Sequence, residues 1–155
     1  MNVDALREIE ARLTAPGAPF EVVEADVLGA PARVFKERVP SLRALLLPVA
    51  ELHGVLPMAV CYGGPMNRCL ARLAEIAGDG DEAQDRWDAA LTACTELGAR
   101  PMRARVQVES GALLLRRGDK RGGRSRIAEG VALAESLGMR DVVAAGRAHL
   151  DRART

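Results

Sequence analysis

The stretch CLARLAEIAGDGDEAQDRWDAALTACTELG (residues 69–98) is echoed forty positions later by ESGALLLRRGDKRGGRSRIAEGVALAESLG (residues 109–138). The residues that this shift aligns are mainly small or turn-forming, and the pairs include Ala71 and Gly111, Gly78 and Gly118, Asp79 and Asp119, Ala83 and Gly123, Ala90 and Gly130, and Gly98 and Gly138. A long repeat with small residues at fixed offsets is typical of a solenoid of paired helices. The sequence therefore predicts two consecutive helical hairpins between about Cys61 and Met139.

Within each predicted hairpin, the small residues indicate where the two helices cross, because helices approach closely only where their side chains are small. Glycine inside a helix costs about 1 kcal/mol relative to alanine, and close backbone approach would offset this cost. The larger Trp87 and Ile127 are expected in the core between the hairpins. The expected contact points are Ala71, Ala83 and Ala90 in the first hairpin and Gly111, Gly123 and Gly130 in the second.

The remaining segments extend this mainly α architecture at both ends. Residues 4–13 have helical apolar spacing, and the alternation over 20–27, followed by a turn and residues 33–36, predicts a short β-hairpin. We therefore expect an N-terminal helix plus β-hairpin extension over residues 1–38 and a helical-repeat domain over residues 39–155. Its expected elements are a helix at 42–52 that contains Pro48, hairpins at about 57–98 and 101–138, and a terminal helix at 141–152. The first helix of the first hairpin is expected from about Pro57 to Ala77, with an interruption at Gly63-Gly64-Pro65.

Several residues are suited to the helix ends. Asp79 or Asp81 can cap the second helix of the first hairpin, and Asp141 can cap the terminal helix. Gly98 and Gly138 can take the left-handed conformation that ends a helix. The apolar residues expected to seal the open end of the stack are Val142, Val143, Ala145 and Leu150.

The number of repeats bears on assembly. Solenoids usually need about three repeats to be stable, whereas this chain is predicted to have two hairpins, one preceding helix and one terminal helix. A short stack with open ends is expected to dimerise or to dock on a partner. We therefore expect a homodimer or an obligate partner protein.

Composition excludes several classes of function. The chain of 155 residues is 48% hydrophobic and 28% charged, which is ordinary for a globular protein. Its net charge of +1 gives no global attraction to nucleic acid or to an anionic membrane. No apolar run approaches the roughly 20 residues of a membrane span, and the first residues lack the basic and apolar regions of a signal peptide. A cytoplasmic protein that binds neither membrane nor nucleic acid is expected.

The sequence has no recognisable catalytic or metal-binding pattern. Cys61, Cys69 and Cys94 lack metal-ligand spacing and are expected to be small buried hydrophobic residues. His53 and His149 stand beside no cluster of Cys, Asp or Glu, so they are expected at the surface or its boundary. No HExxH or GxSxG motif occurs. We therefore expect no enzymatic activity, no cofactor and no metal.

Candidate partner contacts lie on the first helix of each hairpin, where charged residues recur at intervals that place them on one helix face. They are Arg68, Arg72 and Glu75 in the first hairpin and Arg105, Glu109 and Arg116 in the second. Arginine is suited to binding carboxylates, so one interpretation is a concave groove for an acidic peptide or a protein C-terminus. The alternative interpretation is a solvated face whose arginines and glutamates pair with one another.

A second cationic feature is the run RRGDKRGGRSR (residues 116–126), which contains six basic residues and one Asp. Its glycines would let backbone amides approach a phosphate. The run lacks the GxxxxGK[ST] pattern of a nucleotide-binding loop and has no interleaved aromatic residues for stacking on single strands. A solvated turn between two helices is therefore the preferred interpretation.

The segments CYGGPMNRCLARLAEIAGDGDEAQDRW, LGARPMRAR, LLLRRGD and ALAESLGM resemble tetratricopeptide repeats, in the long-linker form of the C-terminal region of large bacterial signalling regulators that carry an ATPase domain. The resemblance covers about Leu42 to Leu150. It implies an antiparallel helix-hairpin repeat that serves as a protein–protein interaction scaffold or regulatory module. Ser110, Gly123 and Gly130 depart from the expected alanines or larger apolar residues, which implies a looser second hairpin.

Residues 1 to about 46 resemble a different family. The segments REIEARLTAPGAPFEVVEADVLG and RVFKERVPSLRALL are similar to the N-terminal leader of AMP-forming fatty-acyl-CoA ligases. The Ser/Thr/Gly-rich loop that holds ATP in that family has no counterpart in this sequence, so the resemblance implies no adenylation activity. It implies, as the alternative function, an accessory or remnant protein tied to acyl-CoA ligase metabolism.

Overall fold

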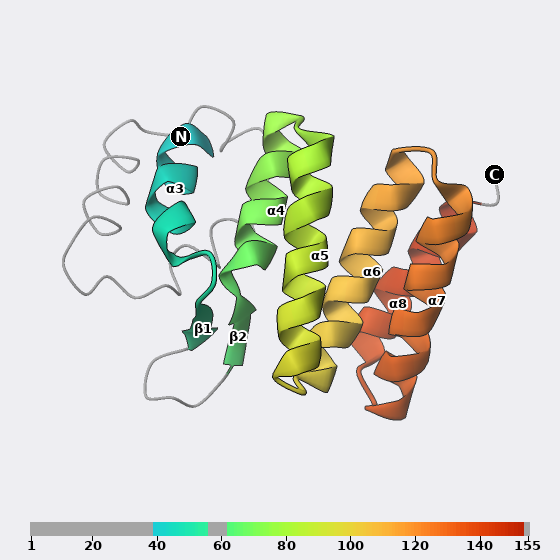
Figure 1. Cartoon of the computed structure of the whole chain (residues 1–155). Helices are drawn as coiled ribbons and strands as arrows, with labels where there is room; N and C mark the ends of the chain where they lie inside the picture. The colour runs from blue at the N-terminus through green and yellow to red at the C-terminus, as the bar shows by residue number, and fades with distance from the viewer. Residues whose placement is uncertain (1–38, 56–61, 154–155) are drawn as a thin grey trace, which may run out of the picture.

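The computed structural model describes residues 39–55 and 62–153 of the chain. In these segments the protein is mainly α-helical, as predicted, with six α-helices and one antiparallel sheet of two short strands (Figure 1). The elements in chain order are α3 (Val39–Leu46), the 3-10 helix η2 (Leu47–Val49), β1 (His53–Val55), β2 (Tyr62–Pro65), α4 (Met66–Ala77), α5 (Gly80–Glu96), α6 (Arg100–Arg116), α7 (Lys120–Ser136) and α8 (Arg140–Arg152). The helix expected at 4–13, the β-hairpin expected at 20–36, most of the ligase-like segment and Cys61 lie outside the described residues.

Helices α5 to α8 begin at a constant interval. Their first residues are Gly80, Arg100, Lys120 and Arg140, so each helix with its turn occupies 20 residues, and two such units make the forty-residue repeat. Figure 1 shows α4 to α8 lying side by side, joined by short turns that reverse the chain. The described residues therefore contain the two expected helix pairs, α4–α5 and α6–α7, followed by α8.

A glycine turn of one type connects each of these helices to the next. At the first turn, the Gly78 amide donates to the Glu75 carbonyl at 3.1 Å, and the Asp79 amide donates to the Ala74 carbonyl at 3.0 Å. The other three turns repeat this pair of bonds, which is the Schellman arrangement that satisfies the last carbonyl groups of a helix. It requires a positive φ, which glycine adopts without strain. The residues in this position are Gly78, Gly98, Gly118 and Gly138, with φ of 85°, 68°, 93° and 71°.

Aspartate caps two of the helices. The Asp79 carboxylate accepts a hydrogen bond at 3.0 Å from the amide three residues along, at the start of α5. Asp119 accepts the equivalent bond at 2.8 Å at the start of α7. The cap expected at Asp141 is wrong, because α8 begins one residue earlier, after Met139. Asp141 instead accepts a hydrogen bond from the Arg105 guanidinium at 2.7 Å.

The crossing of α6 and α7 is closer than a side chain would allow. A Cβ atom on Gly123 would lie 2.8 Å from the carbonyl oxygen of Gly111, and one on Gly130 would lie 2.9 Å from that of Ala104. The backbones of the two helices are therefore in direct contact, which also explains why glycine stands inside both helices. The expectation of a looser second hairpin is wrong, because the smaller residues bring its helices together. At the equivalent positions of the first hairpin, the fully buried residues are Ala71, Ala83 and Ala90.

Both larger side chains are buried as predicted, but only Trp87 lies between the two hairpins. Trp87 of α5 is fully buried in a cluster with Val106 of α6, so it packs between the two hairpins. Ile127 of α7 is also fully buried and belongs to a cluster with Val142 of α8. The expected burial is confirmed for the two cysteines that the structure describes, Cys69 and Cys94, which are free thiols.

The segment before α4 differs from the prediction. The helix expected at 42–52 is the shorter α3, which tightens into η2 at Pro48, a residue whose missing amide cannot continue an α-helix. The chain then forms β1, which pairs with β2 so that Gly54 faces Gly64 and His53 faces Pro65. Gly64 has a φ of 113°, which no α-helix contains, so α4 starts only after Pro65. The helix expected from about Pro57 therefore begins nine residues later, at Met66.

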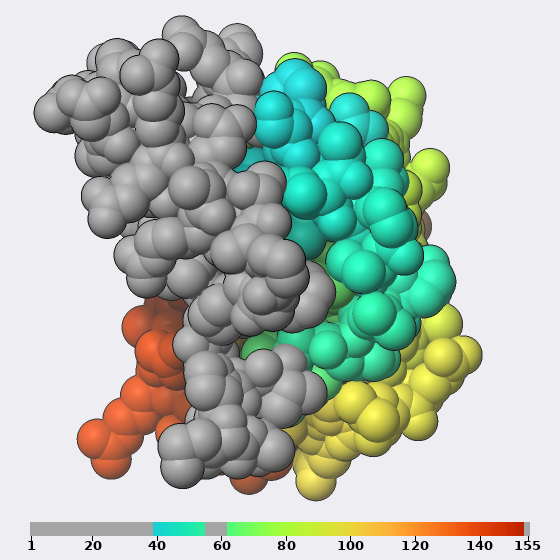
Figure 2. Space-filling view, turned by 90° about the vertical axis from the view of Figure 1, so that its left-hand side faces the viewer, coloured from blue at the N-terminus to red at the C-terminus, as the bar shows by residue number. Residues whose placement is uncertain are grey.

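At the α3 end of the stack, α3 and η2 form part of the molecular surface, shown in cyan to blue-green in Figure 2. Leu42 and Leu46 of α3 are buried against α4. Leu45, Leu47 and Leu52 are instead 43%, 42% and 56% exposed. Large apolar side chains are therefore accessible at this end.

At the other end of the stack, α8 covers α7 and α6. Val142 is buried, and Val143 and Leu150 pack partly buried against the same cluster. Ala145 is exposed, so its predicted role in sealing this end is wrong. Gly146 takes the buried place instead, because a Cβ atom there would lie 2.4 Å from a methyl group of Val131.

Candidate partner-binding face

The first helices of the two hairpins and the terminal helix form one face, termed here the α4–α6–α8 face. Along α6, residues recur on this face at intervals of three or four positions, which places them in one line on the helix. Ion pairs connect this line to α4 on one side and to α8 on the other. The residues in the line are Met102, Arg105, Glu109, Ala112 and Arg116.

Five of the six predicted contact residues form one ion-pair network across α4 and α6. The buried Arg68 guanidinium donates two hydrogen bonds to the Glu109 carboxylate, at 2.9 and 3.0 Å. Arg72 lies 3.7 Å from Glu109 and 3.6 Å from Glu75. Arg116 completes the network by donating to Glu75 at 2.5 Å. In the structure these five residues pair with one another, as the alternative interpretation of the sequence describes.

The network is attached to the hydrophobic core through Trp87. The indole Nε1 of Trp87 donates to Glu75 at 2.7 Å. The guanidinium carbon of Arg72 lies 5.5 Å from the ring centroid of Trp87, within the range of a cation–π interaction. The same tryptophan thus satisfies its polar group and stabilises two members of the network.

Arg105, the sixth predicted residue, belongs to a separate ion pair. It donates to Asp141 of α8 at 2.7 Å, and both side chains are exposed to solvent. The hydrogen bond from Arg105, together with one from the backbone amide of Val142, lowers the pKa of Asp141. Arg105 therefore connects α6 to α8 rather than to α4.

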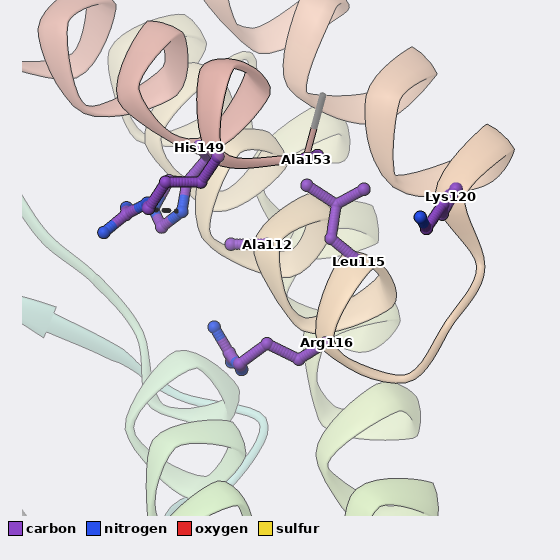
Figure 3. Close-up of a pocket in the computed structure, with 7 residues that line it drawn as sticks. Ala112, Leu115, Arg116, Lys120, His149 and Ala153 are labelled. Carbon is purple, nitrogen blue, oxygen red and sulfur yellow. Dashed lines mark hydrogen bonds between the residues drawn. The ribbon is translucent and has the colours of Figure 1, made fainter. Parts of the chain in front are cut away.

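A cationic recess of about 440 Å³ opens between the last turns of α6 and α8 (Figure 3). Its basic side chains come from three helices, Arg116 from α6, Lys120 from α7 and Arg152 from α8, and no carboxylate lines it among the described residues. Figure 3 shows Arg116 and His149 on opposite sides of the opening. The Lys120 side chain has no hydrogen bond or ion pair to any described residue. The lining residues are Ala112, Leu115, Arg116, Lys120, His149, Arg152 and Ala153.

The pKa of His149 is lowered by its position in the cationic recess. Burial lowers the pKa of this imidazole, and the charges of Arg152, Arg116 and Arg72 lower it further, while Glu109 opposes them. The His149 Nδ1 atom lies 3.1 Å from a guanidinium nitrogen of Arg152. Burial and the positive field thus both favour the neutral imidazole of His149, and the same field attracts anions.

An apolar recess of about 660 Å³ lies at the opposite end of α6. Met102 lies in its wall, and Leu97 at the α5–α6 turn is 57% exposed. The two polar groups that line it already have partners, since Arg105 bonds Asp141 and the Tyr62 hydroxyl bonds His53 Nδ1 at 2.7 Å. The recess is therefore suited to an apolar group. Its lining residues are Tyr62, Leu97, Ala99, Pro101, Met102, Arg105 and Met139.

The basic run at residues 116–126 is distributed over several contacts. Arg117 donates to the Asp81 carboxylate at 2.5 Å, Arg126 donates to Asp88 at 2.7 Å, and Arg124 donates to the Ala153 carbonyl at 2.6 Å. These three arginines therefore bind neighbouring helices, so the interpretation of the run as a solvated turn holds only in part. Lys120 is the member of the run that reaches the cationic recess together with Arg116.

Sequence reasoning did not single out His149 and Arg152 as partner contacts, and it assigned Lys120 to a solvated turn within the basic run at residues 116–126. They lie on helices α7 and α8, and only the packing of α8 beside α6 brings them next to Arg116. The one available signal was the helix periodicity of α8, in which His149 and Arg152 are three residues apart and so share a face. This signal does not indicate which helix the face meets.

Within residues 39–55 and 62–153, no group of three His, Cys, Asp or Glu side chains could hold a metal ion, and no helix is long and apolar enough to span a membrane. The chain matches no protein-family model, no curated protein and no solved structure. The described part of the chain is a stack of helical hairpins with a cationic and an apolar recess on one face.

Proposed function

We propose that this chain is a protein–protein interaction module, a short tetratricopeptide-like stack that binds an acidic segment of a partner protein on the α4–α6–α8 face. The observation that supports the proposal is the cationic recess, to which three helices each contribute one basic side chain. Carboxylate groups pair well with such a cluster, and arginine binds them with defined geometry. The proposal assigns the module no catalytic role and no cofactor.

The tetratricopeptide-like nature of the stack is part of the proposal. It is supported by the constant 20-residue spacing of the helices and by the small residues at each crossing. In stacks of helix pairs, equivalent helices of successive repeats line one extended surface that binds partners. The ion-pair network favours this use, since side chains that are already ordered lose little conformational freedom on binding.

Fluorescence anisotropy with a labelled polyglutamate peptide tests the proposal. Lys120→Glu should weaken binding about tenfold or more, because it replaces an attraction worth about 1.5–3 kcal/mol with a repulsion. Arg121→Glu makes the same change of charge at the adjacent exposed residue, which does not line the recess, and should have a much smaller effect. Equal affinities of the two variants, or equal binding of a polylysine peptide by the native chain, would show the proposal to be wrong.

We also propose that the stack associates, either as a homodimer or with an obligate partner. The exposed Leu45, Leu47 and Leu52 at the α3 end support this, because accessible large apolar side chains favour association. Sedimentation velocity should show a mass above that of one chain at micromolar concentrations. A folded chain that stays monomeric over this range would contradict the proposal.

A further inference from the structure

We infer that the α4–α6–α8 face recognises a bipartite segment, an extended stretch of a partner protein with an apolar side chain at one end and acidic side chains about six residues away. The inference rests on the proposed function and specifies the chemistry of the partner. It follows from the two recesses, which lie at the two ends of the same line of α6 residues.

The position of the two recesses on α6 sets the spacing. Met102 lines the apolar recess and Arg116 lines the cationic recess, and both belong to the line of residues along the α4–α6–α8 face. Fourteen residues separate them, which corresponds to about 21 Å of helix. An extended chain advances about 3.3 Å per residue. A segment that fills both recesses therefore needs its acidic side chain about six positions along the chain from its apolar side chain.

The apolar recess is suited to one aliphatic side chain. Met102 and Met139 lie in its wall, and methionine adapts its shape to different apolar groups. Leu97 is exposed there and would lose contact with water when the recess fills. Because Tyr62 and Arg105 already have hydrogen-bond partners, the recess imposes no need for a polar ligand.

The surface between the two recesses is expected to discriminate little between different partner segments. It is occupied by the ion-pair network, in which the carboxylates of Glu75 and Glu109 are bonded to arginines. Binding a charged side chain there would require breaking a formed pair. Discrimination between segments is therefore expected at the two ends of the face, where the ligand meets Lys120 in the cationic recess and the exposed Leu97 in the apolar recess.

Labelled peptides of four designs test the inference by fluorescence anisotropy with the full chain. The bipartite peptide has a leucine, a spacer of serine and glycine, and two aspartates six positions after the leucine, and it is made in both chain directions. The second design replaces the leucine by serine, the third replaces the aspartates by asparagine, and the fourth shortens the spacer by three residues. The bipartite peptide should bind about tenfold more tightly than each of the others, in at least one direction, since it alone buries a leucine and pairs its carboxylates.

Two pairs of variants locate the two ends. Leu97→Ser should weaken binding of the bipartite peptide but leave that of the leucine-free peptide unchanged. Leu137→Ser is the control and should change neither, because Leu137 stands at the equivalent position, the end of α7, and does not line the recess. Lys120→Gln should weaken both peptides, and Arg121→Gln should weaken neither. Equal affinity of the bipartite, leucine-free and shortened peptides would overturn the bipartite inference and leave acidic binding intact. Failure of every acidic peptide to bind would overturn the inference together with the proposed function.

Discussion

Arg68 of α4 and Glu109 of α6, forty-one residues apart in the sequence, form a two-pronged ion pair with N–O distances of 2.9 and 3.0 Å. Arg68 is only 5% exposed, so the pair lies inside the stack rather than on its surface. It joins the first helix of one hairpin to the first helix of the next. The same contact therefore holds the two hairpins in register and lies beneath the centre of the candidate binding face.

Breaking this pair should destabilise the fold strongly. Glu109→Ala leaves the buried Arg68 guanidinium without its main counter-charge, which costs about 3–5 kcal/mol of unfolding free energy. Arg147→Ala is the control, because its ion pair with Glu135 is largely exposed and such pairs contribute about 0–1 kcal/mol. Urea denaturation followed by circular dichroism measures both. Similar losses in the two variants would contradict a structural role for the Arg68–Glu109 pair.

Trp87 should be the most costly single side chain to remove. Trp87→Ala leaves a cavity between the two hairpins and is expected to lower the unfolding free energy by about 3–5 kcal/mol. Trp87→Phe keeps an aromatic ring but removes the bond from Nε1 to Glu75, so its smaller loss measures how far the core and the ion-pair network depend on each other. Circular dichroism is the suitable signal, since Trp87 is the chain's single tryptophan and neither variant retains its fluorescence. A variant Trp87→Ala as stable as the native chain would show that the repeat register is wrong.

Gly123 should not tolerate the smallest possible side chain. Gly123→Ala would normally stabilise a helix, yet here the added Cβ atom would lie 2.8 Å from the Gly111 carbonyl oxygen. We expect a net loss of about 1–3 kcal/mol, because α6 and α7 must separate. Gly80→Ala is the matched control, since its Cβ atom would meet only the Arg117 side chain, at 3.4 Å. Thermal unfolding of both variants distinguishes close backbone contact from a general intolerance of alanine.

The stability of the fold should fall as the pH falls through the range of His149. Burial and the neighbouring arginines lower the pKa of His149 from 6.5 in the folded chain. Below pH 6.5 the unfolded chain therefore binds this proton more readily than the folded chain, and protonation favours unfolding. Urea denaturation between about pH 7.5 and pH 5.5 should show decreasing stability, and His149→Gln should reduce the slope. The Asp141 pKa is lowered from 3.8, so its contribution is lost only in stronger acid and does not overlap this range.

An acidic ligand should make protonation of His149 in the folded chain less unfavourable. A bound carboxylate stabilises the imidazolium form of His149, so polyglutamate binding should strengthen as the pH falls toward the lowered pKa of His149. The same titration with His149→Gln should show a weaker dependence on pH. A native chain whose peptide affinity does not change over this range would indicate that the ligand lies away from His149.

Most of the helical architecture could be predicted from the sequence because its signals are local. The Schellman turns at Gly78, Gly98, Gly118 and Gly138 and the cap at Asp79 depend on a few consecutive residues, and all five were predicted or placed among the aligned repeat positions. The β1–β2 pair was missed because each strand has only three or four residues. The prediction of a looser second hairpin was wrong, because glycine can weaken a helix but can also let a second helix pack closer. Which effect prevails depends on whether the backbone of another helix lies against the glycine, as it does at Gly123 and Gly130.

The repeat, the helices and the burial of Trp87 and Ile127 follow from the sequence, because apolar spacing and turn residues act along the chain. Which charged side chains pair with one another depends instead on the packing of the helices. Arg68 and Glu109 could each have faced solvent, yet the distance between α4 and α6 brings them into one pair. The cationic recess likewise exists because α6 and α8 end where α7 begins, so that Arg116, Arg152 and Lys120 line one recess. Charge–charge contacts between helices depend on packing distances, and no pattern within one helix specifies those distances.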